Sequence, residues 1–233
     1  MPSVESMNIV LVPSFNEEEH IQELIARLKK ILKLKTIVVD DGSTDSTVEI
    51  VKKMGVTLIQ HSKNKGKAEA IKTGFKYILR NYPKAKHVVL LDADMQYYPE
   101  DAAKLLKPLE DGDADFVTGY RDWSTVPFRH NLGNFVWKTS FNLLFGTSFK
   151  DTNCGYMALN RKTVELMSKI LYGGYILENA MFVEAIKRKL RIKQVPVRVV
   201  YNEKRGVVVG SRVVLGLFLF ILEEGFKYRL GIK

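Results

Sequence analysis

The sequence predicts an α/β protein whose sheet is mostly parallel and carries helices on both faces. Through about the first 120 residues, short β-branched runs alternate with segments whose apolar residues recur at helical spacing. Each run also ends in polar or turn-forming residues. Strands and helices in alternation build parallel sheets, because parallel neighbours are joined by a crossover that usually contains a helix.

Five runs in this first half are predicted strands, and helices are expected between them. After the first run, Asn16 and Glu19 resemble a capping box at a helix start. Gly55 suits the end of the second helix, and Pro99 suits the first turn of the fourth. The predicted strands cover residues 8–12, 36–40, 56–60, 87–92 and 115–119, and the third helix covers residues 67–81.

Beyond about residue 120 the strict alternation ends. Pro196 lies within the last predicted strand, which indicates an edge position or a bulge because proline cannot donate to a neighbouring strand. No linker or repeat divides the 233 residues, so we expect a single domain with two functional halves, residues 8–121 and 122–233. The second half should hold an irregular loop and then a helix within 127–146, a turn leading into a strand within 151–159, helices at 161–171 and 178–190, and a strand at 192–201.

The composition is that of a globular chain, with 46% hydrophobic and 27% charged residues. Cys154 is the one cysteine, which excludes an intramolecular disulfide and fits a reducing compartment. The four histidines are too scattered for a zinc site. The formal net charge of +10 is compatible with solubility alone or with an anionic partner, namely nucleic acid, a nucleotide or an anionic membrane surface.

Neither end of the chain resembles a membrane span. The N-terminal stretch MPSVESMNIVLVPS has no basic region followed by a long apolar run, so no signal peptide is expected. The longest apolar run near the C-terminus, VVLGLFLFIL at 213–222, has 10 residues. A spanning helix needs about 20. Two interpretations of this run remain open: a helix of the core, or a segment that lies on a membrane surface.

Polar and mostly acidic residues follow three of the predicted strands. The first strand leads into PSFNE (13–17), the second ends in Asp40-Asp41, and the fourth ends in Asp92-Ala93-Asp94. Ligands of parallel sheets bind beyond the carboxyl ends of the strands. These residues are therefore expected to converge on one ligand site.

Asp92 and Asp94 share one strand face, where two carboxylates repel each other unless a cation or hydrogen bonds compensate. All-oxygen ligands suit a hard cation, so the pair predicts a site for Mg²⁺ or Mn²⁺, to which Gln96 could add an oxygen. Such an ion commonly holds substrate phosphates and neutralises the charge of a leaving group. The alternative is a solvated strand end whose aspartates cap the next helix.

The stretch DDGSTD (40–45) contains a second candidate pair. Its last residues suit a helix start, but that role does not explain Asp40 and Asp41. Carboxylates at a strand end accept hydrogen bonds from ribose hydroxyls or a base N–H, so both are candidates for nucleotide binding. No G-x-G-x-x-G loop is present. The stretch NKGK (64–67), before a predicted helix, suits either an anion site or a solvated turn.

Five stretches stand in a characteristic order: PSFNE (13–17), VVDDGSTD (38–45), NKGKAEAIKTGF (64–75), LLDADMQ (90–96) and VTGYR (117–121). In order and spacing they resemble the inverting family-2 glycosyltransferases, which have the GT-A fold. Later stretches resemble one branch of that family, the dolichol-phosphate mannose and glucose synthases. These are PFR (127–129), DTNCGYMAL (151–159), VPV (195–197) and VGSR (209–212).

The resemblance implies a role for each matching residue. It implies a nucleotide-sugar donor in the first loop and at the acidic strand ends, with Mg²⁺ or Mn²⁺ beside the donor diphosphate. It also implies that Arg129 binds the acceptor phosphate and that Arg205 and Arg212 close over the phosphates. The implied donor contacts are Pro13, Phe15, Glu17, Asp40, Asp41, Asp92, Ala93, Gln96, Gly119, Arg121, Arg205 and Arg212, and the implied metal ligands are Asp92, Asp94 and Gln96.

The chain departs from the family pattern in its second half. The closing block reads KRGVVVGSR, with Arg212 where lysine is usual. The spacing from Arg205 to the rest of the block is about one residue longer than usual. The acidic-Asp dipeptide that carries the general base in many members is not evident. An alcohol acceptor needs a base, and Asp151 is then the candidate, whereas a phosphate acceptor is already ionised. The candidate catalytic residues are therefore Asp94, Arg129 and Asp151.

Together the residues and the resemblance predict a metal-dependent enzyme. It should transfer a sugar, with inversion, from a donor of the GDP-mannose or UDP-glucose class to a polyprenyl (dolichyl) phosphate, and UDP-N-acetylglucosamine remains open. The alternatives are a family-2 transferase acting on a saccharide or protein hydroxyl, and a non-enzymatic nucleotide-binding module. Nucleic acid is not expected, because the acidic strand ends would repel its backbone. The expected location is cytoplasmic, peripheral on the cytoplasmic face of the membrane, since the positive chain would associate with anionic lipid.

Overall fold

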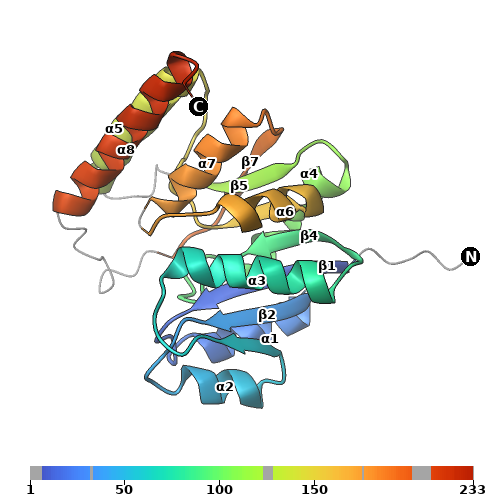
Figure 1. The fold of residues 1–233 in the computed structure, drawn as a ribbon. Coiled ribbons are helices and arrows are strands. Elements are labelled where there is room, and N and C mark those ends of the chain that lie inside the picture. Colours follow the sequence, from blue (N-terminus) through green and yellow to red (C-terminus); the bar gives the residue numbers. More distant parts are fainter. Residues whose placement is uncertain (1–6, 32–33, 123–127, 175, 201–210, 233) are drawn as a thin grey trace, which may run out of the picture.

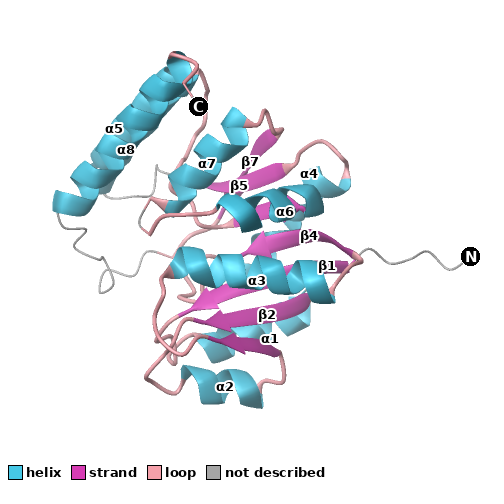
Figure 2. Ribbon diagram, viewed as in Figure 1, coloured by secondary structure: helices cyan, strands magenta, loops and turns pink. Residues whose placement is uncertain are grey.

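The fold is described from a computed structural model, shown as a ribbon in Figure 1. The structure describes residues 7–31, 34–122, 128–174, 176–200 and 211–232, and at 31, 128–134, 136 and 211–214 it describes the backbone alone. Figure 2 shows strands in the middle of the molecule with helices on both sides, which is the predicted α/β class.

Seven strands of the described residues form one sheet. They are β1 (Met7–Ser14), β2 (Lys35–Asp40), β3 (Thr57–Gln60), β4 (Ala85–Leu90), β5 (Phe116–Arg121), β6 (Met157–Asn160) and β7 (Ile192–Val197). Their spatial order is β3-β2-β1-β4-β6-β5-β7. β6 is antiparallel to β4 and β5, and the other neighbours are parallel. The sheet is therefore mixed and mostly parallel, as the sequence and its family resemblance predicted.

Helices cover both faces of this sheet (Figure 1). One face carries α3 (Lys67–Asn81), α6 (Arg161–Ile170) and α7 (Leu177–Lys187), and the other carries α1 (Ile21–Ile31), α2 (Thr47–Lys53) and α4 (Ala102–Glu110), which follows the 3-10 turn η1 (Pro99–Asp101). Two more helices, α5 (Phe128–Phe145) and α8 (Ser211–Arg229), lie side by side at one end of the sheet.

The central strand β1 is buried on both of its faces. Ile9 and Leu11 belong to the apolar core that includes α3 and α6, whereas Val10 and Val12 belong to the core that includes α1 and α4. All four side chains are fully buried. A strand buried on both faces appears in the sequence as an uninterrupted apolar run. This explains why NIVLV was recognisable as a strand.

The element boundaries correct two expectations and confirm a third. The first helix begins at Ile21, and Asn16 does not cap it, because the Asn16 side chain accepts a hydrogen bond from the backbone N–H of Thr44. Residues 128–145 form one helix where an irregular loop was expected first. β7 lies at the edge of the sheet, as Pro196 predicted, but it ends at Val197.

The apolar run at 213–222 is part of the longer helix α8. Leu217 and Ile221 bury one face of α8 in the core that includes α3. Gly225 permits close contact with α5, because a Cβ there would lie 2.6 Å from the Cβ of Leu144. The opposite face of α8 is apolar and exposed. It consists of Leu215, Leu219 and Phe226, and Leu230 continues it just beyond the helix end; the four side chains are 54–71% exposed. The helix therefore has one core face and one exposed apolar face.

Candidate active site

The acidic residues of the first half lie at one edge of the sheet. β1, β2 and β4 are parallel neighbours, so the segments that follow them leave the sheet at the same edge. β5 also ends at this edge, because it and β4 are both antiparallel to β6. Hydrogen bonds join the loops after β1 and β2, and Asp41 and Lys67 connect them through the start of α3 to the segment after β4.

The loops after β1 and β2 are bound to each other. The backbone N–H of Asn16 donates to Ser43 Oγ at 2.9 Å, and the backbone N–H of Thr44 donates to Asn16 Oδ1 at 2.8 Å. The backbone N–H of Glu17 donates to Thr47 Oγ1 at 2.9 Å. Asn16 adopts a left-handed φ of 54°, which asparagine tolerates better than most residues. These bonds fix the path of the PSFNE loop.

Three predicted nucleotide contacts lie on this loop. Pro13 is buried at the end of β1, where it is level with Val39 of β2. Phe15 is 42% exposed and thus accessible to a ligand. The Glu17 carboxylate lies 3.6 Å from His20 Nδ1. The positions of these residues at the sheet edge are compatible with a nucleotide loop, and their contact with a ligand stays a prediction.

Asp40 is fully buried, and other groups of the chain occupy its carboxylate. The backbone N–H groups of Gly42 and Ser43 donate to Asp40 Oδ2 at 3.1 and 3.0 Å, and the Ser43 hydroxyl contacts Oδ1. Gly42 has a φ of 79°, and a Cβ there would lie 2.6 Å from the carbonyl carbon of Lys63. The geometry gives Asp40 a role in shaping the turn after β2, where the sequence predicted a contact with a nucleotide.

Asp41 shapes the neighbouring loop. Its carboxylate accepts hydrogen bonds from the backbone N–H groups of Lys65 and Gly66 at 3.0 and 2.7 Å. It also lies 2.7 Å from Nδ1 of the buried His61, whose Nε2 is 3.0 Å from Thr73 Oγ1. The Asp41 carboxylate thus holds the segment that leads into α3. If Asp41 also contacts a base or ribose, as predicted, its carboxylate must accept hydrogen bonds from the ligand and from these loop groups together.

Lys67, at the start of α3, is the basic partner of Asp92. Its Nζ lies 2.8 Å from Asp92 Oδ1 and 2.9 Å from Oδ2. The same Nζ lies 3.0 Å from Oε1 of Glu178, in the first turn of α7. Burial alone would lower the pKa of Lys67, but the two carboxylates outweigh burial and raise it above its ordinary value. Burial raises the pKa of Asp92, and Lys67 opposes that shift.

Asp94 and Gln96 follow on the same segment. Asp94 Oδ1 accepts a hydrogen bond from the backbone N–H of Gln96 at 3.0 Å. Ala93 between the two aspartates is buried in the core that includes α1. The carbonyl of Gln96 accepts from the backbone N–H of Val200 at 2.8 Å, so the chain beyond β7 is fastened beside this segment. Asp94 and Gln96 both line a cavity of about 220 Å³.

Arg121 and Asp151 form a buried ion pair at the end of β5. Arg121 Nε donates to Asp151 Oδ2 at 2.7 Å, and Nη2 donates to Oδ1 at 3.0 Å. Asp151 is fully buried. Burial disfavours the charged guanidinium, but Asp151 outweighs burial and raises the pKa of Arg121. The predicted base and the predicted donor contact are therefore partners of each other.

Gly119, a predicted donor contact, lies inside β5 among packed side chains. A Cβ at this position would lie 2.7 Å from Val197 Cγ2 and 2.9 Å from Cys154 Sγ. Real Cβ atoms do not approach other atoms so closely. The structure thus explains glycine at this position by close packing, and a donor contact stays a prediction.

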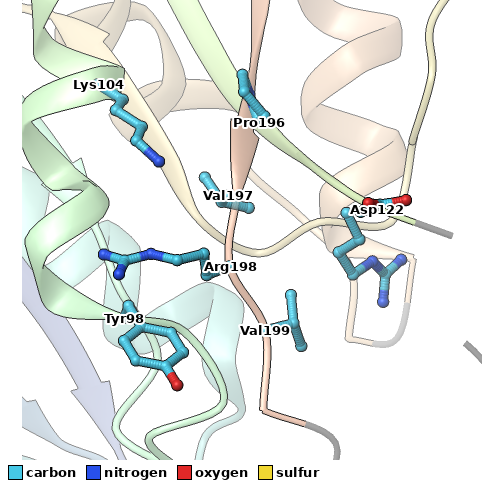
Figure 3. A pocket seen from close by; sticks show the side chains of 8 residues that line it. Tyr98, Lys104, Asp122, Pro196, Val197, Arg198 and Val199 are labelled. Carbon is cyan, nitrogen blue, oxygen red and sulfur yellow. The ribbon is translucent and has the colours of Figure 1, made fainter. Parts of the chain in front are cut away.

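A second cavity of about 460 Å³ lies beside the ends of β5 and β7, as Figure 3 shows. Tyr98 lines both cavities. The Arg198 and Arg27 guanidinium groups lie 4.5 and 5.4 Å from the Tyr98 ring centroid. The larger cavity is lined by Tyr98, Lys104, Arg121, Asp122, Pro196, Val197, Arg198 and Val199. Aromatic, apolar and cationic groups thus meet in one cavity.

The side chains of three predicted arginines lie outside the described part of the structure. Arg205 lies outside the described residues. Arg129 and Arg212 belong to the first turns of α5 and α8, and their side chains lie outside the described part of the structure. Their predicted contacts with phosphate stay predictions.

Sequence reasoning missed the contact between Lys67 and Glu178. Lys67 lies in the stretch NKGK (64–67), for which the sequence offered two interpretations, an anion site or a solvated turn. Glu178 gave no signal, because an acidic residue in the first turn of a helix is expected from the helix dipole alone. The search for an acidic-Asp dipeptide could have drawn attention to Glu178-Asn179, where asparagine follows the acid.

Residues 9–165 match the family model described as glycosyl transferase family 2. The chain belongs to that family. The match contains all five stretches that carried the resemblance, and it covers well over half of the glycosyltransferase.

Relatives are similar to this glycosyltransferase along nearly its whole length. An uncharacterised protein of Methanocaldococcus jannaschii is 34% identical over 220 residues, which cover 89% of this chain and 94% of the relative. The UDP-N-acetylglucosamine–dolichyl-phosphate N-acetylglucosaminyltransferase of Methanococcus voltae is 28% identical over 235 residues, with 91% and 92% covered. Similarity to these relatives therefore covers more of the chain than residues 9–165, which the family model matches.

Solved structures confirm the fold of the glycosyltransferase. Glucosyl-3-phosphoglycerate synthase of Mycobacterium tuberculosis, in complex with Mn²⁺, uridine diphosphate and phosphoglyceric acid, superposes with a TM-score of 0.76. The match covers 98% of this chain and 80% of that chain at 19% identity. The predicted GT-A fold is thus present. Within the described ranges, no helix has the length and apolar character needed to cross a membrane.

Proposed function

We propose that this glycosyltransferase moves a hexose, with inversion, from a nucleotide-sugar to a polyprenyl phosphate. The observation that carries the proposal is the position of Asp92 and Asp94 at the end of β4, among loops that match family 2. An acceptor phosphate oxygen would bond to the anomeric carbon from the face opposite the leaving group. The bond from that carbon to the nucleoside diphosphate would break as the new bond forms, and the nucleoside diphosphate would leave with the electron pair.

Asp92 and Asp94 fit a divalent cation by their chemistry. Their carboxylates supply hard oxygen ligands on one segment, and Gln96 can add a carbonyl oxygen. No group of three or more His, Cys, Asp or Glu side chains in the described ranges is placed to hold a metal ion. Two carboxylates are nevertheless a common protein contribution to a Mg²⁺ site, because substrate phosphates and water supply the rest. Bound Mg²⁺ or Mn²⁺ would stabilise the negative charge on the departing nucleoside diphosphate.

The burial of Asp151 and its ion pair with Arg121 favour a phosphate acceptor over an alcohol. A general base must reach the proton that it removes. Asp151 is fully buried, and Arg121 holds both of its oxygens. Protonation of Asp151 would remove the negative charge that holds the bidentate pair with Arg121. An acceptor that is already ionised avoids this requirement, because it needs only positioning and charge neutralisation.

The starts of α5 and α8 are the proposed site for the acceptor phosphate. Arg129 and Arg212 stand in the first turns of these two helices, which lie side by side (Figure 1). Helix N-termini favour anions, because their first backbone N–H groups have no partner within the helix. In this proposal Arg129 steers the acceptor phosphate, and Arg212, with Arg205, closes over the donor phosphates.

The exposed apolar face of α8 supports a peripheral position on a membrane. Leu215, Leu219, Phe226 and Leu230 are all more than half exposed. An exposed apolar helix face binds at the lipid headgroup boundary, and a positive chain associates with anionic lipid. We propose that this face holds the enzyme at the cytoplasmic surface, where a polyprenyl phosphate presents its headgroup.

The donor can be identified by ligand-dependent stability. We would measure melting temperature with GDP-mannose, UDP-glucose and UDP-N-acetylglucosamine, each with Mg²⁺ or Mn²⁺, because a ligand that binds only the folded state raises stability. Family resemblance favours GDP-mannose or UDP-glucose, and the Methanococcus voltae relative adds the third donor. The best donor is then tested for sugar transfer to a polyprenyl phosphate.

Asp94→Asn tests the carboxylate pair in the same assay. We expect transfer to fall to background while the melting temperature of the ligand-free protein stays near that of the unmutated chain. Asp111→Asn is the matched control, because Asp111 follows α4 at the opposite edge of the sheet and should leave transfer intact. Full transfer by Asp94→Asn would contradict the site. Transfer to a free saccharide but not to lipid phosphate would favour the hydroxyl-acceptor alternative.

A further inference from the structure

Lys67 occupies the carboxylate that the proposed metal needs. Its Nζ is within 2.9 Å of both oxygens of Asp92, and it is also 3.0 Å from Glu178 Oε1. The three side chains are 33%, 24% and 18% exposed, so the cluster is in contact with solvent. An ammonium this close to both oxygens repels a divalent cation and competes with it for the Asp92 carboxylate.

The chain builds this cluster from both of its halves. Lys67 begins α3 and Asp92 follows β4, whereas Glu178 belongs to α7. Gly155, before β6, lies against the cluster, because a Cβ there would be 2.7 Å from Asp92 Oδ2 and 3.3 Å from Lys67 Nζ. A side chain at this position would therefore displace the Asp92 carboxylate. The close approach of the loop confines that carboxylate on the side of β6.

The cluster of Lys67, Asp92 and Glu178 contains more carboxylates than ammonium groups. One ammonium faces the carboxylates of Asp92 and Glu178, and Asp94 adds a third carboxylate two residues along the chain. The cluster therefore keeps an excess of negative charge after Lys67 has paired. Glu178 also gives the ammonium a partner that is independent of Asp92. Lys67 can release Asp92 without becoming unpaired.

We infer that Lys67 is a tethered cation that competes with the divalent metal for Asp92 and has Glu178 as its alternative partner. This inference rests on the metal site proposed above. Without metal, Lys67 compensates the repulsion between Asp92 and Asp94. With metal, the ammonium stays with Glu178 and leaves the Asp92 oxygens to the ion. Lys67 and Glu178 are thus positioning residues that act through Asp92.

Lys67→Met tests the competition directly. The probe is Mn²⁺, titrated into the full chain by calorimetry, alone and with saturating UDP or GDP. Removing the competing ammonium should tighten Mn²⁺ binding about fivefold or more, which is the range of ordinary coupling between two bound ligands. Lys67→Arg keeps a cation and should bind Mn²⁺ more weakly than Lys67→Met does. Lys65→Met removes the same charge from an exposed side chain of the same loop and should leave the Kd near that of the unmutated protein.

Glu178→Gln gives a prediction of the opposite sign. Without the second carboxylate, Lys67 should pair more firmly with Asp92 and Mn²⁺ should bind more weakly. If Glu178 acts through Lys67, its substitution should have little effect when Lys67 is already methionine. The double variant therefore separates this role from a general loss of negative charge, which would weaken Mn²⁺ binding in both backgrounds.

Two results overturn the inference in distinguishable ways. If Mn²⁺ binds the unmutated protein but Lys67→Met leaves its Kd unchanged or raises it, Lys67 is not a competitor and the metal site stands. If Mn²⁺ does not bind the unmutated protein with either nucleotide, the metal site fails and the competition fails with it. Should Lys67→Met not fold, Glu178→Gln still decides, because an unchanged Kd for Mn²⁺ in that variant would contradict the role of Glu178.

Discussion

At the scale of single residues, Gly119 has a structural explanation that the sequence did not suggest. The VTGYR stretch drew attention to it as a donor contact. In the structure, β5 passes so close to Val197 and Cys154 that a Cβ has no room. The packing of β5 against the chain around it thus requires glycine whether or not a donor approaches.

Gly119→Ala should lower the free energy of unfolding by about 1–3 kcal/mol, because an added methyl overpacks a full core. Urea unfolding of the two proteins measures the difference. Gly174→Ala is the matched control, since nothing lies within 4 Å of a Cβ at Gly174. Equal stability of Gly119→Ala and the unmutated chain would contradict the prediction, because β5 would then accommodate the added methyl group without cost.

At the scale of elements, one carboxylate joins three strands at the edge opposite the candidate site. Asp115, just before β5, accepts hydrogen bonds from the backbone N–H and the Nε of Arg191 at 3.1 and 3.0 Å. Asn160, at the end of β6, donates to its other oxygen at 2.9 Å. The hydrogen bonds from Arg191 lower the pKa of Asp115 to about 2, against a smaller opposing effect of burial.

This pair predicts a loss of stability in acid. A carboxyl group whose pKa is lower in the folded state stabilises the protein above its unfolded value of about 3.9. That contribution should disappear as the pH falls from about 4 toward 2. Asp115→Asn should therefore show a shallower fall of melting temperature across this range than the unmutated chain. Asp111→Asn serves as the control, and an equal fall in Asp115→Asn and the unmutated chain would contradict the assignment.

At the scale of the whole molecule, α5 and α8 extend from one end of the sheet (Figure 1). Their contact with the core involves Phe141, Phe145, Leu217 and Ile221. The exposed apolar residues of α8 therefore stand on a helix that is packed against the core, which suits the membrane contact proposed above.

Replacing Leu219 and Phe226 together by serine should weaken binding to vesicles that contain anionic lipid by about tenfold or more, since both apolar side chains lose their burial. Co-sedimentation measures the bound fraction. Met7→Ser is the control, because Met7 is 38% exposed at the far end of β1. Unchanged vesicle binding by the double variant would exclude this face as the membrane contact.

Most of the fold was predictable because its signals are local. The strands of the first half contain short apolar runs such as IVLV in β1 and IVV in β2, and such a run needs only its own residues to be recognised. The positions of the acidic residues at strand ends followed from the same runs. The partners of those residues were not predictable, because Lys67 meets Glu178 across 111 positions of sequence. Asp40 and Asp41 likewise gave no sign that backbone N–H groups already occupy their carboxylates.

The order of the strands also constrains how the chain is made. β4 and β5 are consecutive in sequence, yet β6 lies between them in the sheet. While the ribosome is still synthesising residues 122–156, β4 has an open edge and β5 has no neighbour to pair with. Open edges are templates for aggregation, so the nascent chain is most vulnerable during this interval. The insertion of β6 closes the edge of β4, while β5 keeps one open edge until β7 is made, so the complete sheet requires both halves of the chain.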